Sequence, residues 1–373
     1  MEFSKYADVN PKCGKVPNSF YYIDLECVNA GEIKDLRIEM AETAPSRAQR
    51  LLTLYDILFQ TVRPYQKNNY HFKVENDLPT VASTGYAVFR TEQSSEYLYE
   101  LIHTERFLSD IMKRCTGTSF PAVSSSDIED IAIWIPKFQE QKKIGDFLTL
   151  VDTKIAKQRL LIEHLKKYKR GLLDKLLEDN STDANWHIVR LQDVANGFDY
   201  GMNSAATTFD GVHKYIRITD IDDDSRQYLS DDIVSPSDTP EEKYRVSDND
   251  ILFARTGASV GKSYLYTPDD DALYFAGFLI RISVKKEYDS YFVYLNTLTS
   301  KYEKWLRLES MRSGQPGVNA EQYRNYAFRC PNYQTQVKIA NIIKGIDSKI
   351  LKERMSLSKL NSLKNGLLQQ LFI

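Results

Sequence analysis

The stretch Pro136-Lys-Phe-Gln-Glu-Gln141-Lys-Lys-Ile144 returns later in the chain as Pro331-Asn-Tyr-Gln-Thr-Gln336-Val-Lys-Ile339. Residues 136–176 and 331–371 align without a gap at an offset of 195, and 16 of the 41 positions are identical. Asp-x-Lys-Ile and Lys-x-Gly-Leu-Leu also occur in both copies, beginning at Asp152 and Asp347 and at Lys169 and Lys364. Identity over this length indicates an internal duplication.

The resemblance between the copies continues upstream in a weaker form. Asp56-Ile-Leu-Phe59 matches Asp250-Ile-Leu-Phe253, and Pro121-Ala-Val123 matches Pro316-Gly-Val318. The offset changes by a few residues between these matches, which indicates small insertions in loops. Each copy therefore has a variable globular part followed by a better-matched helical part. We expect four parts, at residues 1–136, 137–180, 181–331 and 332–373.

Apolar residues in both matched segments follow a heptad pattern, which predicts long helices that pack as a coiled coil. In the first copy they are Ile144, Leu148, Val151, Ile155, Ile162, Leu165, Leu172 and Leu176, and in the second Ile339, Ile343, Ile346, Ile350, Leu357, Leu360, Leu367 and Leu371. The pattern is interrupted at the same two places in each copy, at Gln158 and Lys169 and at Glu353 and Lys364. One such stripe is typical of an ordinary core helix, whereas two with matching gaps favour mutual packing. Two equal copies related by a pseudo-two-fold axis predict an antiparallel pair.

The globular parts read as mixed α+β domains. Period-2 apolar runs predict strands at 20–24, 54–59 and 87–89 in the first copy, and at 214–218, 250–254, 263–266 and 278–282 in the second. Helical periodicity follows at 95–114 and at 291–308. The predicted fold class is α+β: two globular domains separated by an antiparallel two-helix coiled coil, arranged as a pseudo-two-fold internal repeat.

Composition limits the classes of protein that this chain can be. Its 373 residues carry a net charge of −2 with a pI near 6.3, which excludes a protein that coats nucleic acid by bulk charge alone. Residues 137–178 are locally basic, with eleven Lys/Arg and six Asp/Glu. The four cysteines are far apart, and the chain has neither an apolar run long enough to span a bilayer nor an apolar segment at its N-terminus. We therefore expect a cytoplasmic protein with reduced thiols.

One motif resembles a phosphate-binding loop. Gly257-Ala-Ser-Val-Gly261-Lys262-Ser263 has three residues between its glycines, where a Walker A loop has four, and a strand pattern follows where a helix should begin. We interpret it either as a glycine-rich loop that holds a nucleic-acid phosphate or as a plain hairpin turn. The five histidines show no metal-ligand spacing, and no combination of residues suggests catalysis. No catalytic, metal or cofactor site is expected.

The repeated Pro-x-x-x-x-Gln, Asp-x-Lys-Ile and Lys-x-Gly-Leu-Leu elements resemble those of specificity subunits of type I restriction-modification enzymes. Two further stretches, Asp250-Ile-Leu-Phe-Ala-Arg-Thr-Gly257 and Gly314-Gln-Pro-Gly-Val318, are also similar to that family, so the resemblance covers nearly the whole chain. Two features depart from the family pattern. Thr335 stands where a glutamate usually precedes the glutamine, and Gln60-Thr-Val-Arg63-Pro64 replaces the Arg255-Thr-Gly257 element.

The resemblance implies a non-catalytic subunit that recognises a bipartite DNA site, with one domain for each half-site. It also implies two modification (methyltransferase) subunits docked on the helices, with restriction subunits added, and these partners would bind S-adenosylmethionine and ATP. The candidate DNA-contacting residues are polar loop residues: Arg63, Lys67, Asn68, Asn69, Thr118 and Ser119 in the first copy, and Arg255, Thr256, Ser259, Lys262, Gln315 and Asn319 in the second. Two alternatives remain: a coiled-coil assembly scaffold that does not bind DNA sequence-specifically, and a nucleotide-binding enzyme.

Overall fold

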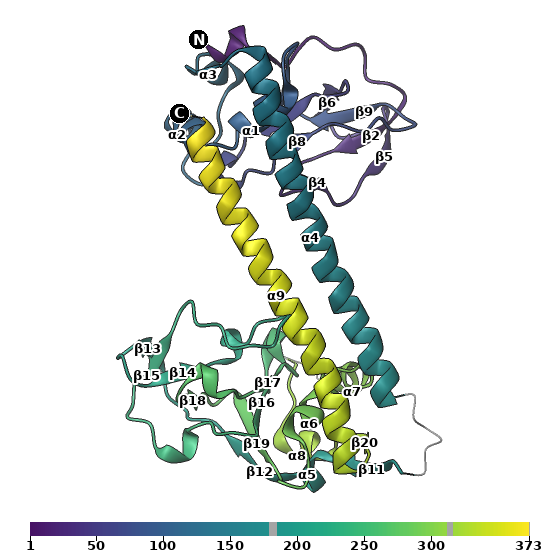
Figure 1. Cartoon of the computed structure of the whole chain (residues 1–373), viewed down its shortest axis with the longest axis vertical. Helices are drawn as coiled ribbons and strands as arrows, with labels where there is room; N and C mark the ends of the chain where they lie inside the picture. Colours follow the sequence, from purple (N-terminus) through teal and green to yellow (C-terminus); the bar gives the residue numbers. More distant parts are fainter. Residues whose placement is uncertain (179–184, 312–315, 373) are drawn as a thin grey trace. The chain divides into compact units, whose positions relative to one another are not determined.

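The computed structural model describes residues 1–178, 185–311 and 316–372. Its contacts divide the chain into two compact units: unit 1 is Met1–Leu160 with Met355–Ile373, and unit 2 is Leu161–Arg354. Each unit thus combines one globular part with segments of two long helices, α4 (Phe138–Glu178) and α9 (Tyr333–Leu371) (Figure 1). In the described ranges, none of the helices combines the length and the apolar character needed to cross a membrane.

Both long helices begin two residues after a proline, as the repeat predicts. The amide Nε2 of Gln141 donates a hydrogen bond to the Pro136 carbonyl at 2.8 Å, and Gln336 Nε2 donates to the Pro331 carbonyl at 2.9 Å. Both glutamine side chains are buried. The recurring Pro-x-x-x-x-Gln element therefore has a structural role, because the glutamine side chain fixes the backbone just before the helix begins.

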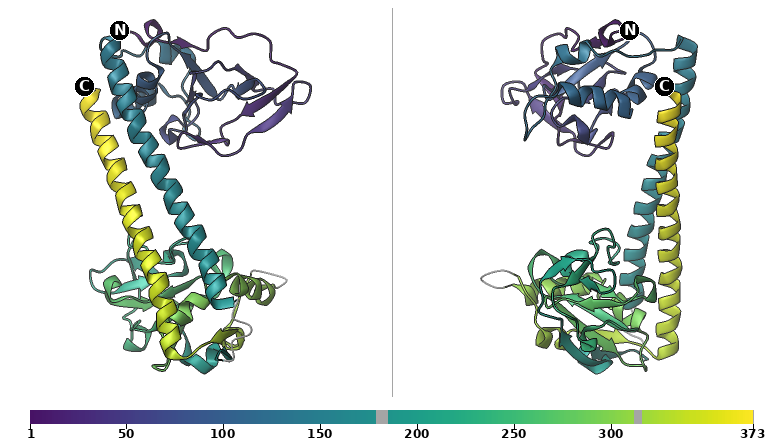
Figure 2. Two further views of the ribbon diagram at one scale, coloured as in Figure 1. Left: turned by 45° about the vertical axis from the view of Figure 1, so that its right-hand side comes forward. Right: turned by 90° about the vertical axis from the view of Figure 1, so that its left-hand side faces the viewer.

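The two helices pack in antiparallel fashion within each unit. In unit 1, Lys364 Nζ of α9 lies 2.6 Å from Asp152 Oδ1 of α4. In unit 2, Lys169 Nζ of α4 lies 2.6 Å from Asp347 Oδ1 of α9. Early residues of one helix thus meet late residues of the other, and Figures 1 and 2 show the first turns of α4 beside the last turns of α9 in unit 1. The offset of 195 maps one ion pair onto the other, which confirms the predicted antiparallel pair and internal repeat.

Unit 1 contains two four-stranded sheets, with the orders β1-β10-β7-β8 and β5-β2-β9-β6, and the β3–β4 hairpin. Their strands are β1 (Asp8–Val9), β2 (Ser19–Ile23), β3 (Val28–Asn29), β4 (Glu32–Ile33), β5 (Arg37–Met40), β6 (Ala48–Leu51), β7 (Ile57–Gln60), β8 (Tyr70–His71), β9 (Thr80–Ser83) and β10 (Tyr86–Arg90). Three short helices follow: α1 (Ser95–Leu101), α2 (Glu105–Arg114) and α3 (Ser125–Glu129). The three strands predicted for this copy are confirmed, with shifted ends.

Unit 2 repeats the first of these sheets in the order β12-β19-β16-β17 and adds three two-stranded sheets, β11-β20, β13-β15 and β14-β18. Its strands are β11 (His187–Arg190), β12 (Ala195–Tyr200), β13 (Ala206–Thr208), β14 (Lys214–Ile216), β15 (Val234–Pro236), β16 (Asp250–Ala254), β17 (Ser263–Leu265), β18 (Leu273–Phe275), β19 (Leu279–Val284) and β20 (Ala327–Cys330). Its short helices are α5 (Leu191–Val194), α6 (Ser290–Asn296), α7 (Ser300–Ser310) and α8 (Ala320–Asn325). The α+β fold class, with two β-rich domains and two long packed helices, is confirmed.

The prediction of one continuous helix after each sheet is wrong in detail, because both helices are broken at a threonine. Thr104 is the N-cap of α2 and accepts a hydrogen bond from the Phe107 N–H, and Thr299 caps α7 by accepting one from Tyr302. A threonine at this position satisfies a backbone donor that would otherwise lack a partner. The break occurs at equivalent positions of the two copies, and helical periodicity alone does not detect it.

Each globular core is completed by the end of a long helix. In unit 1, Leu368 and Phe372 lie in one apolar cluster with Tyr97, Leu101 and Leu148. The rings of Tyr97 and Phe372 are stacked with centroids 4.9 Å apart. In unit 2, the α4 residues Leu173 and Leu177 occupy the corresponding place, in a cluster with Trp186, Phe292 and Ile343. These four residues each stand one place after a heptad position, so the late turns of both helices bury a second set of apolar side chains against the globular parts.

A buried carboxyl group lies beside the Lys364–Asp152 ion pair. Glu100 of α1 is only 1% exposed, and Lys364 Nζ lies 3.1 Å from its Oε2. Burial raises the pKa of Glu100 to about 8, although the charge of Lys364 opposes the shift. The folded state therefore holds the Glu100 proton more tightly than the unfolded chain does.

We expect the free energy of unfolding of unit 1 to fall as the pH rises from about 5 to about 8, because the unfolded carboxyl has lost its proton at the lower end of this range and the folded one has not. Glu100→Gln keeps this position uncharged and should remove that pH dependence. Urea denaturation at the two pH values measures the effect, with the exposed Glu42→Gln as the control. Equal pH dependence in the wild type and in Glu100→Gln would contradict the assignment.

Candidate nucleic-acid interface

In unit 2, a loop follows the central strand β16 and is held by three backbone hydrogen bonds. Arg255 N–H donates to the Phe278 carbonyl at 3.0 Å, and the Arg255 carbonyl accepts from Val318 N–H at 2.9 Å. Gly257 N–H donates to the Pro316 carbonyl at 3.1 Å. The loop backbone is therefore fixed from two sides, and its side chains project from a rigid support.

Unit 1 repeats the same three bonds at the equivalent positions. Thr61 N–H donates to the Gly85 carbonyl at 3.0 Å, and the Thr61 carbonyl accepts from Val123 N–H at 3.1 Å. Arg63 N–H donates to the Pro121 carbonyl at 2.7 Å. Arg63 thus occupies the place of Gly257, and both have a positive φ, 55° and 70°. The two units therefore share a backbone scaffold and carry different side chains on it.

The glycine-rich motif of unit 2 is a β-hairpin turn. It joins the antiparallel strands β16 and β17, and strand β17 follows directly where a phosphate-binding loop would continue as a helix. Gly261 is required there, because its φ is +80° and a Cβ would lie 2.0 Å from Leu306 Cδ2. The hairpin interpretation of this motif is thus confirmed.

Several of the candidate DNA contacts in unit 2 are buried or have partners within the unit. Lys262 Nζ lies 2.5 Å from Asp223 Oδ1 and its side chain is 11% exposed, and Ser259 is buried. Neither side chain is thus open to a ligand in this structure, and their role as DNA contacts stays a prediction. Asn319 is exposed and caps helix α8 by accepting from Gln322 N–H, and Thr256 pairs with Gly317 in an isolated bridge. Gln315 lies outside the described residues.

In unit 1, the side chain of Asn69 is buried and hydrogen-bonded within the fold. Its side chain is 1% exposed, its Oδ1 accepts from Gln60 N–H at 2.9 Å, and its Nδ2 lies 3.3 Å from His103 Nε2. Burial lowers the pKa of His103 to about 4. Because its Nδ1 lies 2.6 Å from the Tyr99 carbonyl and donates to it, the neutral ring accepts from Asn69 through Nε2. This network fixes the end of strand β7, from which the loop that carries Arg63 continues.

Of the other candidates in unit 1, Lys67 and Asn68 have partners within the unit, and Thr118 and Ser119 are exposed. Lys67 Nζ lies 2.7 Å from Glu105 Oε1, and the Asn68 side chain accepts a hydrogen bond from Ala30 N–H. Thr118 and Ser119 are exposed, in the loop that Thr116 and Ala122 close by pairing. The open candidates therefore gather where this loop meets Arg63.

One arginine in each unit is stacked on an aromatic ring at this place. The Arg255 guanidinium carbon lies 4.9 Å from the centre of the Tyr200 ring, and that of Arg63 lies 4.2 Å from the centre of the Phe120 ring. Within the described residues, neither side chain has a hydrogen-bond or ion-pair partner. Arg281 and Arg324 are also stacked on rings, but each has a carboxylate partner, Asp199 and Glu321 respectively.

Arg255 lines a cleft of about 580 Å³ in unit 2. Its walls include the exposed rings of Tyr200 and Phe278, the polar side chains of Asn203 and Thr219, and a second arginine, Arg217. Arg217 is neutralised, because its Nε and Nη2 donate to the buried carboxylate of Asp220 at 2.9 and 2.8 Å. One uncompensated guanidinium thus faces a cleft with aromatic and polar walls.

Sequence reasoning missed the walls of this cleft. Phe278 is 58% exposed and is equivalent to Gly85, because the carbonyls of both accept the matching loop N–H. The next residues, Leu279 and Tyr86, are both buried and pair with Ala254 and Gln60. A glycine at this place in the first copy gives no sign of an exposed ring in the second. Phe120 in unit 1 was missed because its neighbours Thr118 and Ser119 were chosen for their polarity.

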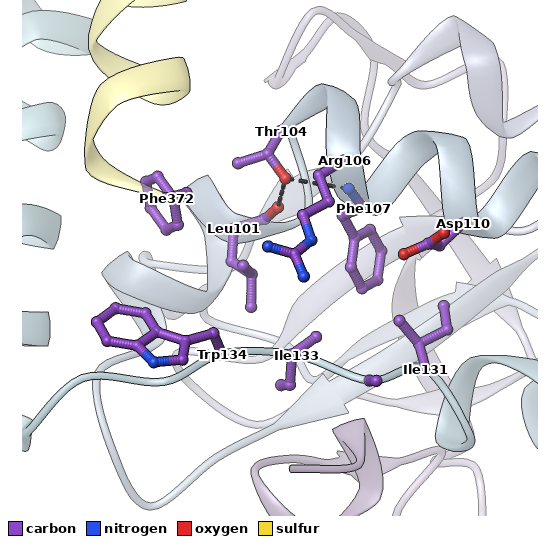
Figure 3. A pocket seen from close by; sticks show the side chains of 10 residues that line it. Leu101, Thr104, Arg106, Phe107, Asp110, Ile131, Ile133, Trp134 and Phe372 are labelled. Atoms are coloured by element: carbon purple, nitrogen blue, oxygen red, sulfur yellow. Dashed lines mark hydrogen bonds between the residues drawn. The ribbon is translucent and has the colours of Figure 1, made fainter.

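Unit 1 also has a small hollow between α2 and the end of α9 (Figure 3). Its volume is about 20 Å³, and Phe107, Trp134 and Phe372 are among its walls. A space of this size holds a water molecule and no ligand. In the part of the chain that the structure describes, no group of histidine, cysteine and acidic side chains is arranged to bind a metal.

The sequence pattern of the family described as "Type I restriction modification DNA specificity domain" matches residues 56–166 and 183–361. This chain belongs to the family of type I restriction-modification specificity subunits. Its relatives in this family include the HindI specificity subunit of Haemophilus influenzae, 26% identical over 42% of this chain and 36% of that one. The MjaVIII specificity subunit of Methanocaldococcus jannaschii is 23% identical over 73% of this chain and 68% of that one. The StySPI subunit of Salmonella potsdam is 22% identical over 75% and 65%.

The chain thus matches about a third of the HindI specificity subunit and about two thirds of the other two. Among solved structures, the type I specificity subunit of M. genitalium has a TM-score of 0.62 and 16% identity, over 100% of this chain and 95% of that one. A chain from a study of assembly and conformational transition of the type I system has the same TM-score and 18% identity, over 100% and 96%. Both matches show that the chain shares the fold of these two solved structures.

Proposed function

We propose that this specificity subunit reads a bipartite DNA sequence, with one globular domain for each half-site, as a non-catalytic part of a type I restriction-modification complex. The observation that carries the proposal is the pair of loops, which are held by the same three backbone bonds and bear different side chains. A rigid backbone with exchangeable side chains is what reading of base edges in the major groove requires. We take 1–136 and 181–331 as the readers and 137–180 and 332–373 as the helical spacers.

The proposed partners are two modification subunits that dock on the long helices, with restriction subunits added to them. Exposed apolar side chains recur on the helices at the repeat offset. In unit 1 they are Phe138, Phe147 and Leu363, and in unit 2 the equivalent Tyr333, Ile342 and Tyr168. All six are between 47% and 61% exposed. Exposed apolar side chains at equivalent positions of the two copies favour two copies of one partner, and DNA modification by this complex would take place in the cytoplasm.

The test is selection of DNA from a randomised duplex pool by the full chain together with its modification subunits. We expect two specified half-sites with a fixed number of unspecified base pairs between them. Affinity for the selected site should exceed affinity for random DNA by about a thousandfold or more at physiological salt. A complex that assembles but retains all sequences equally would contradict the proposal and support an assembly scaffold.

A further inference from the structure

We propose that each half-site contains a guanine that is read by a ring-stacked arginine, Arg255 in unit 2 and Arg63 in unit 1. This inference rests on the proposed function and names the base that the site would take. An arginine fork that donates to guanine O6 and N7 is the commonest specific contact in the major groove. The geometry of Arg255 carries the argument furthest.

Both members of the Arg255 pair are fixed in place. The Arg255 backbone is bonded to Phe278 and to Val318, and the Tyr200 hydroxyl accepts a hydrogen bond from Ala320 N–H at 3.2 Å. The guanidinium carbon lies over this ring at 4.9 Å from its centre, and Arg255 lines the cleft. A side chain ordered before binding loses less entropy when it forms a two-bonded contact.

The surroundings favour a base over a phosphate. A groove that follows the phosphate backbone carries several uncompensated cations. In this cleft Arg217 is neutralised by Asp220, and nearby Lys262 is paired with Asp223, so among the described wall residues only Arg255 keeps its charge free. The remaining walls, the Phe278 ring and the Asn203 and Thr219 side chains, offer the apolar and hydrogen-bonding groups that contact base edges.

Unit 1 also has an arginine that lies over an aromatic ring, at a neighbouring position of the same backbone scaffold. Arg63 lies two places beyond the equivalent of Arg255, and its N–H bond to the Pro121 carbonyl fixes it beside Phe120. Arg63 Nε is buried without a partner in the described structure, which leaves the terminal nitrogens as the exposed donors. Because the two arginines stand at different positions of the loop, the guanines would stand at different places in the two half-sites.

The experiment measures base preference at every position of the selected site, using the full chain in complex with its modification subunits. Arg255→Ala should reduce discrimination at one G·C pair of one half-site by roughly tenfold to a hundredfold and leave the other half unchanged. Arg255→Lys keeps the charge but loses the fork, and should lose the discrimination as well. Arg63→Ala should do the same in the other half. Arg245→Ala, which removes an exposed guanidinium from unit 2, should leave the base preferences unaltered.

Tyr200 serves as a positioning residue in this proposal and has its own test. Tyr200→Phe keeps the ring but loses the hydroxyl that accepts from Ala320 N–H, and should lose part of the discrimination, whereas Tyr200→Leu removes the ring as well and should lose more of it. If Arg255→Ala weakened binding to all sequences equally, Arg255 would be a phosphate contact and the guanine assignment would be overturned. An unchanged base preference in Arg255→Ala would overturn the assignment too. Either result leaves the bipartite site of the wild type standing. A wild-type complex without any sequence preference would instead refute the proposed function, and the guanine assignment with it.

Discussion

Exchange of residues 1–135 for the corresponding segment of a relative with another target is expected to replace one half of the selected DNA sequence completely. The other half and the spacing should stay as they are. The physical reason is the location of the open side chains of unit 1, since Arg63 and Phe120 and the loop that carries them all lie within the exchanged segment. The helices α4 and α9 and the whole of unit 2 are untouched.

The junction must preserve the contacts between the exchanged domain and the helices. The Tyr6 hydroxyl donates to Gln141 Oε1 at 2.7 Å, and Tyr97 stacks on Phe372. A donor segment with a tyrosine at both places should therefore assemble on the retained helices. The matched exchange of residues 181–331 should change the opposite half only. Sequencing of the modified or selected sites reads the outcome, and a change in both halves, or in neither, would refute the modular account.

Removal of the Phe372 ring is expected to destabilise unit 1 by about 3–5 kcal/mol, because Phe372→Ala leaves a cavity in a packed core. Phe372 is 8% exposed, lies against Tyr97 and shares a core cluster with Leu101. The loss is comparable with the whole stability of many domains, about 5–15 kcal/mol. Hydrogen exchange of α1 should accelerate by about two to four orders of magnitude, with α6 of unit 2 as the internal reference.

The duplication supplies matched variants for this experiment. Leu173→Ala removes a 3%-exposed side chain of α4 from the core of unit 2 and should accelerate exchange in α6 while α1 remains protected. Leu363→Ala changes an exposed residue of α9 and should alter stability by no more than about 0.5 kcal/mol. Unchanged exchange of α1 in Phe372→Ala would show that the end of α9 is not part of the unit 1 core.

The architecture was predictable because its determinants are repeated in the sequence. Heptad stripes with gaps at Lys169 and Lys364 indicated two helices that pack together, and each lysine at a gap is paired with an aspartate of the other helix. Apolar alternation located all seven predicted strands. What periodicity could not show were the breaks at Thr104 and Thr299, since a capping threonine interrupts a helix without disturbing its apolar face.

The candidate site was only partly predictable. Arg63 and Arg255 were chosen as polar loop residues, and among the described residues neither side chain has a hydrogen-bond or ion-pair partner. Lys262 and Asn69 were selected by the same reasoning, yet one is paired with Asp223 and the other is buried beside His103. Polarity in a loop does not distinguish a side chain that serves the fold from one that is open to a ligand. The exposure of Phe278 depends on tertiary packing, which the sequence does not encode locally.

The two lysine–aspartate pairs also bear on the ancestry of the chain. Asp152 and Lys169 belong to the first copy, and Asp347 and Lys364 to the second, so each pair joins one copy to the other. Two molecules of a single-copy ancestor would have formed both pairs as a symmetric homodimer and would have bound a palindrome. In the duplicated chain the two copies are free to diverge, because a point mutation in one copy leaves the equivalent residue of the other unchanged.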